Sequence, residues 1–454
     1  MKKKILFIIG VLALIVLFPL VSCENKESEH THIYEDSVVD PTYETGGYTL
    51  HTCSVCGYSY KDTYTDVLLK TYNITYNLDG GTNNNSNPAS YNKETDTICL
   101  KDPTKTGYAF TGWTTDTITT PTKNLTIEKG SVGDKVFTAN WQRLYSYTDS
   151  TKTSLYFGAY PQTKVSDDSI MTSLNNLAGT LPTSTNTYLW TDYGYYIEGS
   201  ISSYMYYIDI DYDNNGDYDY RGVYFTENRP YYTYQAVGNT VKTNSQLENG
   251  YNRNIVYWFK YEPIKWNLLK TLDNKALIIS DLVLDSQDYY YNPIPRSSAT
   301  DYQGSSTTST TNANNYMYSH IRSWLNQTFY DTAFSTLEKQ IIEITTVDNS
   351  ATENVAGSNY SAGDNTNDYM FLLSFEETNS YYTTESTMTA QGSDYAKTQG
   401  LYVDASSGNS YYWLRTPNYY NTATAYNVHY ASGIGVSSVY ISSYGVRAAC
   451  WINL

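Results

Sequence analysis

A lysine-flanked apolar segment at the N-terminus determines where the fold of this chain can begin. Residues 2–4 are lysines, and an apolar run from Ile5 to Val21 follows them and ends just before Cys23. A positive flank, a short apolar stretch and small residues before a cleavage point are typical of a secretory signal. We therefore expect residues 1–22 to be removed and the rest of the chain to fold outside the cytoplasm.

The end of this segment carries a more specific signal. Leu20-Val21-Ser22-Cys23 resembles the lipobox of bacterial lipoproteins. The resemblance implies that Cys23 is acylated, becomes the first mature residue and holds the chain at the outer face of the membrane, in the cell envelope. The polar residues 24–27 suit a tether. A transmembrane helix is the alternative, because the run is only slightly shorter than the ~20 residues that span a bilayer.

Composition limits the partners and favours strands. The 454 residues carry a formal net charge of −17 and show no basic stripe, so we expect no nucleic-acid partner. Tyrosine is abundant, with 52 residues against 11 phenylalanines, and tyrosine and threonine favour strands. Few segments have an amphipathic helical pattern. We therefore expect a multidomain chain of the α+β class that is rich in β-strands.

Residues 23–70 are expected to form a tether with a small Cys/His module. Cys53 and Cys56 form a C-x-x-C-G knuckle, in which two thiolates can share one zinc ion. The two remaining ligands would be histidines, and His32 and His51 are the expected ones. A Cys53–Cys56 disulfide and free thiols are the alternatives. Either a zinc ion or a disulfide would stabilise a segment too small for its own core.

Residues 72–141 predict a small β domain. A strand at 72–78 ends in an Asp-Gly-Gly turn, and aromatic residues would fill the core, with turn or bulge glycines at 107 and 112. The core residues are Tyr108, Phe110, Trp113 and Trp141. The anchors N-x-D-G-G, P-T-K-x-G-Y-x-F-x-G-W and A-N-W resemble the Listeria–Bacteroides repeat, a β-grasp-like module of the internalin B type. The resemblance implies surface display and no catalytic residues.

Residues 145–454 are expected to form a large α+β head. Its motifs are F-G-x-Y-P-Q-T, P-I-x-W, I-R-x-W-L-N, W-L-R-T-P and a terminal G-V-R-x-A-x-W-I-N-L. Together they resemble a bacterial domain of unknown function found on many secreted proteins. The ending also resembles that of C-type-lectin-like and formylglycine-generating-enzyme-like domains, which implies a fold of that kind.

Local patterns in the head predict its main elements. Apolar strands are expected at 261–269, 276–280 and 370–374. Ile321, Trp324, Leu325 and Phe329 recur at helical spacing, and a Ser335–Glu338 capping box would open a second helix that ends at Ile344. The Ser/Thr/Asn-rich stretch 297–315 indicates a loop.

An acidic segment has the oxygen spacing of a calcium loop, with the required glycine at Gly216. Its candidate ligands are Asp211, Asp213, Asn215 and Asp217. Gly222 stands where the bidentate glutamate is expected. The alternative is a hairpin in which strands 204–212 and 218–225 flank an Asn-Asn-Gly turn.

Arg415 and Arg447 are candidate ligand anchors, because guanidinium groups bind carboxylates in a bidentate manner. The alternative is a structural role, in which these arginines tie loops together within aromatic-rich motifs.

No motif in the sequence identifies a catalytic residue. The chain contains no G-x-S-x-G, H-E-x-x-H or phosphate loop, and carboxylate pairs cannot be located from sequence because they lie far apart along the chain. We therefore expect a lipid-anchored extracellular protein that binds or adheres to a glycan or protein ligand without catalysis, with zinc or calcium as the candidate ions. An envelope enzyme acting on glycans and a structural surface component are the alternatives.

Overall fold

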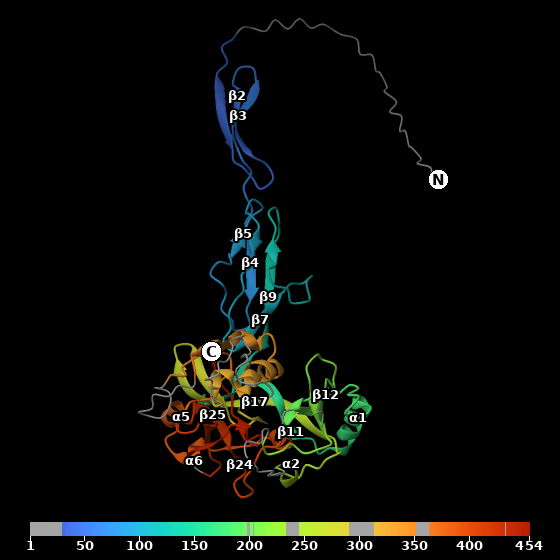
Figure 1. The fold of residues 1–454 in the computed structure, drawn as a ribbon. Helices are drawn as coiled ribbons and strands as arrows, with labels where there is room; N and C mark the ends of the chain where they lie inside the picture. The colour runs from blue at the N-terminus through green and yellow to red at the C-terminus, as the bar shows by residue number, and fades with distance from the viewer. Residues whose placement is uncertain are drawn as a thin grey trace, which may run out of the picture. The chain divides into compact units, whose positions relative to one another are not determined.

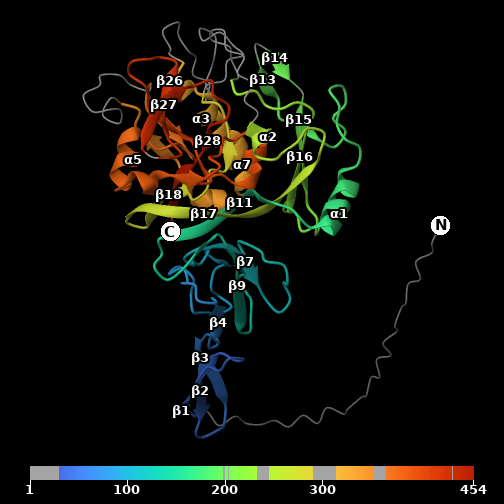
Figure 2. The ribbon, with the colours of Figure 1, turned by 90° about the horizontal axis from the view of Figure 1, so that it is seen from below.

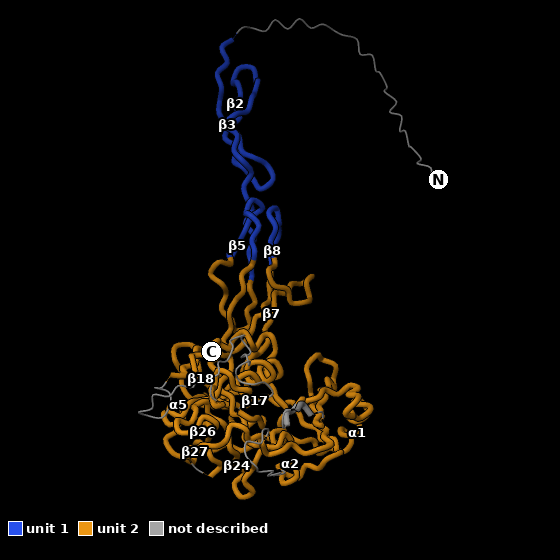
Figure 3. Tube along the Cα trace, viewed as in Figure 1, with its two compact units in different colours: residues 1–75, 88–99, 126–135 blue, residues 76–87, 100–125, 136–454 orange. Residues whose placement is uncertain are grey.

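The computed structural model describes residues 30–197, 200–202, 204–232, 245–289, 313–350, 363–431 and 433–454. The chain divides into two compact units (Figure 3): unit 1 contains residues 1–75, 88–99 and 126–135, and unit 2 contains the rest. Among the described residues, no helix is long and apolar enough to cross a membrane. The apolar run and Cys23 lie outside the described residues, as does most of the predicted loop at 297–315.

Unit 1 contains an antiparallel sheet in the order β1-β2-β3, drawn in blue in Figure 1. These strands are β1 (Tyr34–Val39), β2 (Gly47–Cys53) and β3 (Ser59–Thr65). Short ladders follow in the same unit, between the start of β4 (Tyr72–Asn77) and β5 (Ser90–Tyr91) and between β6 (Ile98–Cys99) and β8 (Thr126–Ile127). The predicted strand at 72–78 is thus confirmed, and it ends in a turn where Asp79 and Gly80 have positive φ.

The first part of unit 2 contains an aromatic core. Of the four residues predicted for it, Phe110 and Trp113 are buried, whereas Tyr108 and Trp141 are half-buried. β7 (Tyr108–Thr114) pairs antiparallel with β9 (Lys135–Arg143), with a bulge between Phe110 and Gly112. Trp113 is fully buried and packs edge-on against Phe110. Gly112 has a φ of +148°, and a Cβ there would lie 2.3 Å from the backbone nitrogen of Thr122. The close approach of two backbones therefore requires glycine at this position.

The head is built on a large antiparallel sheet in the order β12-β15-β16-β17-β18-β29-β20, from which β11 branches off β17 and β10 off β11. β17 is long and runs beside both β11 and β18 (Figure 2). The strands are β10 (Tyr145–Tyr147), β11 (Ser154–Lys164), β12 (Thr191–Asp192), β15 (Met205–Ile210), β16 (Tyr220–Phe225), β17 (Tyr257–Leu272), β18 (Lys275–Ser280), β20 (Ile342–Glu343) and β29 (Ala449–Asn453). This arrangement confirms the β-rich α+β class.

A second sheet in the order β19-β28-β25-β26-β27 completes the head, and its one parallel pair joins β25 to β28. Its strands are β19 (Asp285–Ser286), β25 (Tyr412–Pro417), β26 (Thr424–Val428), β27 (Ile434–Ser438) and β28 (Gly445–Val446). Three short pairings are β13 (Tyr195–Ile197) with β14 (Ser200–Ser202), β21 (Thr345–Val347) with β22 (Thr366–Asp368), and β23 (Ala390–Gln391) with β24 (Asn409–Ser410).

Short helices cover these sheets. They are α1 (Asp168–Ala178), α2 (Ser245–Glu248), α3 (His320–Trp324), α4 (Tyr330–Ala333), α5 (Phe375–Tyr381), α6 (Glu385–Met388) and α7 (Asp394–Thr398). A π turn over Leu325–Phe329 joins α3 to α4 without a break. The four apolar residues predicted to line this helix are all buried, so the helical periodicity identified its inner face correctly.

Two predicted elements in the head are shorter than expected. Ser335 and Glu338 form the reciprocal bonds of a capping box, but only a 3-10 turn over Glu338–Ile341 follows, because Ile342 and Glu343 pair with β29 instead. The apolar segment 370–374 is buried, yet only Phe371 makes a bridge to the sheet. Its last residue, Ser374, caps α5 through a complete capping box with Glu377.

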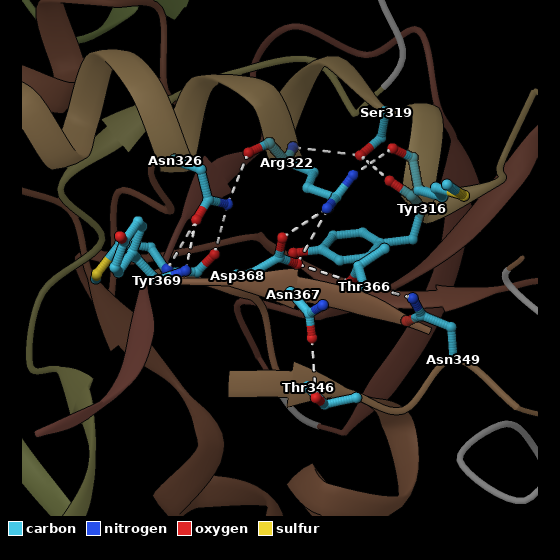
Figure 4. A network of polar contacts seen from close by, with 12 residues as sticks. Tyr316, Ser319, Arg322, Asn326, Thr346, Asn349, Thr366, Asn367, Asp368 and Tyr369 are labelled. Atoms are coloured by element: carbon cyan, nitrogen blue, oxygen red, sulfur yellow. Dashed lines mark hydrogen bonds and ion pairs between the residues drawn. The ribbon is translucent and has the colours of Figure 1, made fainter. Parts of the chain in front are cut away.

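A buried ion pair joins α3 to β22 (Figure 4). Arg322 and Asp368 have no exposed side-chain surface, and the guanidinium Nη2 and Nε donate to one carboxylate oxygen of Asp368 at 2.7 and 2.9 Å. Thr366 donates a further bond to this carboxylate at 2.8 Å. Asn326 binds the backbone on both sides, since it donates to the carbonyl of Met370 and accepts from the amide of Tyr369, each at 2.8 Å. The network fixes the segment after β22 against the helix.

We expect Arg322→Met to destabilise the head by about 3–5 kcal/mol, because it leaves the Asp368 carboxylate buried without its countercharge. Urea unfolding followed by tryptophan fluorescence measures this. Arg253→Met is the matched control: Arg253 pairs with Glu227 at 2.9 Å, but both side chains are more than half exposed, so the loss should be below about 1 kcal/mol. Equal losses in the two variants would contradict the role given to the buried pair.

Candidate functional site

A cavity of about 340 Å³ in the head gathers aromatic rings and carboxylates from strands and helices that are far apart in the chain. β11, β12, β15 and β16 contribute one side, β19 and the segment after it contribute acids, and α3, α4 and α7 complete the wall. The lining residues are Tyr160, Asp192, Tyr193, Gly194, Tyr207, Arg221, Asp285, Gln287, Asp288, His320, Trp324, Thr328, Thr332 and Tyr395.

Arg221 is the cation of this cavity, and its charge is already balanced. Its Nε and Nη2 donate to the two carboxylate oxygens of Asp209 at 2.7 Å each, and Nη1 donates to the hydroxyl of Tyr395 at 3.2 Å. Burial alone would lower the pKa of Arg221, but Asp209, together with Tyr395 and Tyr261, more than offsets this effect and keeps the pKa raised. The guanidinium also lies 4.4 Å from the ring centre of Tyr207. Arg221 therefore organises the wall and has little charge left for an anionic ligand.

Asp285 is the carboxyl group with the most altered acidity in the cavity. The hydroxyl of Tyr160 donates to one oxygen at 2.7 Å, and the backbone amide of Ser286 donates to the other at 2.7 Å. Burial raises the pKa of Asp285 to about 6, although the bonds from Tyr160 and Ser286 act in the opposite direction. The group therefore changes charge near neutral pH, which is typical of functional carboxyls.

Asp288 brings a second carboxylate, and one of its oxygens faces a partner while the other does not. Oδ1 lies 3.4 Å from Nη2 of the buried Arg229 and 3.6 Å from Nδ1 of His320. Oδ2 is buried and accepts no hydrogen bond from any described residue. A buried acceptor without a donor is costly, so it favours a ligand that supplies an O–H or N–H group.

Tyrosine hydroxyls link the inner part of the cavity into one network. The hydroxyls of Tyr193 and Tyr395 lie 2.8 Å apart, and Gln399 donates to Tyr193 at 3.1 Å. Together with the bond from Arg221 to Tyr395, these contacts connect β16 to α7 in the wall of the cavity. The cavity is therefore held in shape before any ligand enters it.

Sequence reasoning did not identify this cavity. Its residues come from segments more than 200 positions apart, and no motif spacing joins them. Two sequence signals nevertheless lie close to cavity residues. Tyr160 is part of the F-G-x-Y-P-Q-T motif, and the acids at 285 and 288 closely follow the apolar strand β18.

The predicted metal ligands of the tether module are only partly brought together. Cys53, Cys56 and His32 cluster, and His30 completes the group, with all four ligand atoms within 4.8 Å of one another. Burial raises the pKa of the Cys53 thiol, but hydrogen bonds from the Cys56 amide and from both histidines outweigh it and lower the value to about 5.

His51 does not join the cluster, which corrects the predicted ligand set. Asp36 stands directly opposite His51 on β1, and Nδ1 lies 2.5 Å from its carboxylate. Nε2 lies 2.7 Å from the carboxylate of Asp62 on β3. Both ring nitrogens are thus engaged across the sheet, and neither is directed at the thiols.

The acidic segment forms the loop of the predicted hairpin between β15 and β16. Asp211, Asp213 and Asp219 bring carboxylate oxygens together, and Asp217 is not part of this group. Asn215 donates through its side-chain amide to Asp213 at 3.1 Å. The carboxylates of Asp211 and Asp219 accept backbone amides of the loop itself, from Gly216 at 2.9 Å and from Tyr212 at 2.7 Å. These bonds account for the acids as turn-forming residues, and calcium binding stays a prediction.

Arg415 and Arg447 lie in the interior and take no part in the cavity. Arg415 binds the carboxylate of Glu377 and the carbonyl of Leu372. Arg447 donates to the carbonyl of Ser280 at 2.7 Å and to the hydroxyl of Tyr412 at 3.3 Å. Both guanidinium groups thus tie separate segments together, so the structural alternative describes them and the ligand-anchor role does not.

Comparison with known proteins identifies two regions. Residues 72–140 match the family model of the Listeria-Bacteroides repeat domain, and residues 273–454 match that of a domain of unknown function, DUF6273. This confirms both resemblances inferred from the motifs, the second over a shorter range than 145–454. Neither the curated proteins nor the solved structures contain a match to the chain. The resemblance to C-type-lectin-like domains stays a prediction.

Asp285 provides a pH test of the cavity. A folded pKa of about 6 against about 4 when unfolded means that rising pH ionises the unfolded chain first. Stability should therefore fall as pH rises from about 4 to about 6, on the order of 2–3 kcal/mol, and Asp285→Asn should remove this loss. Denaturant unfolding of both proteins at several pH values measures the difference.

Asp404→Asn is the matched control. Asp404 is half-buried rather than buried, and hydrogen bonds from Ser406 and then Ser407 lower its pKa to about 2. The stability difference between this variant and the wild type should therefore stay constant over the interval in which Asp285 titrates. A constant difference for Asp285→Asn as well would mean that Asp285 is not a buried neutral carboxyl.

Proposed function

We propose that the chain is a lipid-anchored extracellular protein whose head binds a glycan in the cavity around Asp285 and Asp288. The observation that carries this proposal is the buried Oδ2 of Asp288, a residue of the cavity wall, which accepts no hydrogen bond from the described residues. A buried acceptor without a donor in the wall of an aromatic cavity favours a ligand that carries hydroxyl groups.

The balance of charge narrows the class of ligand. The Arg221 guanidinium is committed to Asp209, while Asp192, Asp285 and Asp288 all line the cavity. Anionic ligands would meet this acidic surface unfavourably. A neutral or amino sugar suits it, since its hydroxyl or amino groups can donate to the carboxylates while its apolar face packs on the tyrosine rings.

Tyrosine suits such a cavity better than phenylalanine would. Its ring supplies contact area at a low entropic cost, and its hydroxyl both donates and accepts. Tyr193 and Tyr207 lie at the wall with ring centres 4.8 Å apart and retain partial exposure. The exposed faces of these rings are the expected stacking surface.

The test is a glycan array probed with residues 24–454, with and without a chelator. We expect saturable binding to one sugar class and at least a tenfold loss with Thr332→Trp, which places an indole in the cavity. Thr336→Trp is the matched control, because Thr336 is exposed, lies close by in the chain and does not line the cavity.

A blank array obtained with folded protein would contradict the glycan proposal. Loss of binding with chelator that is restored by Ca²⁺ but not by Zn²⁺ would transfer the site to the Asp211–Asp219 loop. Equal effects of the two tryptophan variants would place binding outside the cavity.

An enzyme acting on glycans is the second candidate, and the pair of carboxyl groups favours it. Asp285 has a raised pKa and Asp288 is paired with Arg229, so their environments differ, as expected for an acid and a charged partner. Release of sugar fragments from array ligands, abolished by Asp285→Asn, would support this candidate over simple binding.

The anchor has its own test. We expect the wild-type chain to sediment with membranes and to acquire a lipid mass at its N-terminus, and Cys23→Ser to release it into the soluble fraction. Mass spectrometry of the mature N-terminus measures the modification directly. Membrane retention of Cys23→Ser would contradict the lipid anchor and favour the transmembrane alternative.

A further inference from the structure

We propose that His30, His32, Cys53 and Cys56 bind one zinc ion in the tether module of unit 1. These residues play no part in the glycan site, so the proposal is independent of the proposed function. Two histidine nitrogens and two cysteine sulfurs are a common tetrahedral set for structural zinc.

The spacing of the ligand atoms fits a single ion. Sγ of Cys53 lies 3.5 Å from Nε2 of His30, and Sγ of Cys56 lies 3.4 Å from Nδ1 of His32. Bonds of about 2.0–2.3 Å in a tetrahedron place neighbouring ligand atoms roughly 3.3–3.8 Å apart. All four atoms lie within 4.8 Å of one another, so small side-chain adjustments would complete the coordination.

The backbone holds the two halves of the site together. Cys53 ends β2, and its carbonyl accepts the amide of Gly57 at 2.9 Å, with Gly57 at a φ of +74°. The amide of Ser54 donates to the carbonyl of Ile33 at 3.0 Å, which fixes the knuckle beside the histidine segment. The C-x-x-C turn and the His-x-His segment are thus positioned against each other by main-chain bonds.

The module needs such a link because it has almost no core. Among the described residues 30–70, Cys53 is the one buried apolar side chain, at 2% exposure. Large apolar side chains of the same segment are exposed, at Ile33, Val38, Val39, Tyr43, Val55, Tyr58, Tyr60, Tyr64, Leu68 and Leu69. A three-stranded sheet without a buried face is marginal in water, and a metal ion supplies the missing stabilisation.

The donor set selects the metal. Two thiolates with two imidazoles favour zinc over calcium or magnesium, which prefer oxygen ligands. The four protein ligands also fill a tetrahedron and leave no open position, as in structural rather than catalytic sites.

The test uses residues 24–454 purified under reducing conditions with added zinc. Elemental analysis should find one zinc per chain, and cobalt substitution should give the visible bands and thiolate charge-transfer absorption of a tetrahedral two-thiolate site. His30→Ala, His32→Ala, Cys53→Ser and Cys56→Ser should each lower zinc content several-fold.

Two variants separate ligation from general damage to the module. His51→Ala is the matched control: His51 is in the same sheet but outside the cluster, so zinc content should be unchanged. Cys56→His keeps four ligands and should retain the metal while it loses about half of the thiolate charge-transfer intensity.

The proposal is overturned if the reduced wild-type chain binds no zinc, or if mass spectrometry finds a Cys53–Cys56 disulfide that reforms in the presence of zinc. Loss of zinc in His51→Ala with retention in His30→Ala would overturn the ligand assignment. Unchanged cobalt spectra in Cys56→His would do the same.

Discussion

The head depends on buried polar side chains that connect segments far apart in the chain, and the Arg322–Asp368 pair is the most buried of them. Two short strands and a helix of barely more than one turn would not hold each other through apolar contact alone. A guanidinium can bond several acceptors at once, so one arginine fixes a helix, a carboxylate and a carbonyl together. Tyrosine does the same on a smaller scale: Tyr289 and Tyr412 lie in the core while their hydroxyls bind the carbonyls of Arg415 and Met388. In an interior rich in tyrosine rather than phenylalanine, the hydroxyl groups therefore connect separate segments through hydrogen bonds.

The same observation explains what the sequence motifs mean. In I-R-x-W-L-N, W-L-R-T-P and G-V-R the polar residues are structural ties, and in P-I-x-W the indole of Trp266 donates to the carbonyl of Phe157 at 2.7 Å. Gly445 has a physical reason too, because a Cβ there would lie 2.0 Å from Val283. The motifs thus identify the fold and say little about a ligand. The cavity instead combines acids from the region that matches DUF6273 with Tyr160, Asp192, Tyr207 and Arg221, which precede that region.

Strands, the repeat and the inner face of the α3–α4 helix could be predicted, because alternation and helical periodicity are local properties. The cavity could not, because it depends on how β11, β16 and α7 meet. The metal ligands fall between these cases. C-x-x-C is local and was recognised, but the choice between His30 and His51 depends on pairing between strands: Asp36 and Asp62 occupy both nitrogens of His51. A helix was expected after Ser335 because its capping box is present, yet pairing of Ile342 with β29 ended it early.

The proposed glycan site and the proposed zinc site lie in parts of the chain that are stabilised in different ways. The head has a large core and can hold buried, partly unsatisfied carboxylates, because the surrounding packing offsets their cost. The tether module has no comparable core, since the two outer strands of its sheet are exposed along almost their whole length. His30 lies only seven positions after Cys23, so the proposed zinc ion would fix the first described residues after the proposed anchor. Unfolding of a small sheet starts by fraying at its free end. A metal ion bound near that end would prevent this fraying, so the stabilisation is largest where the sheet joins the polar linker.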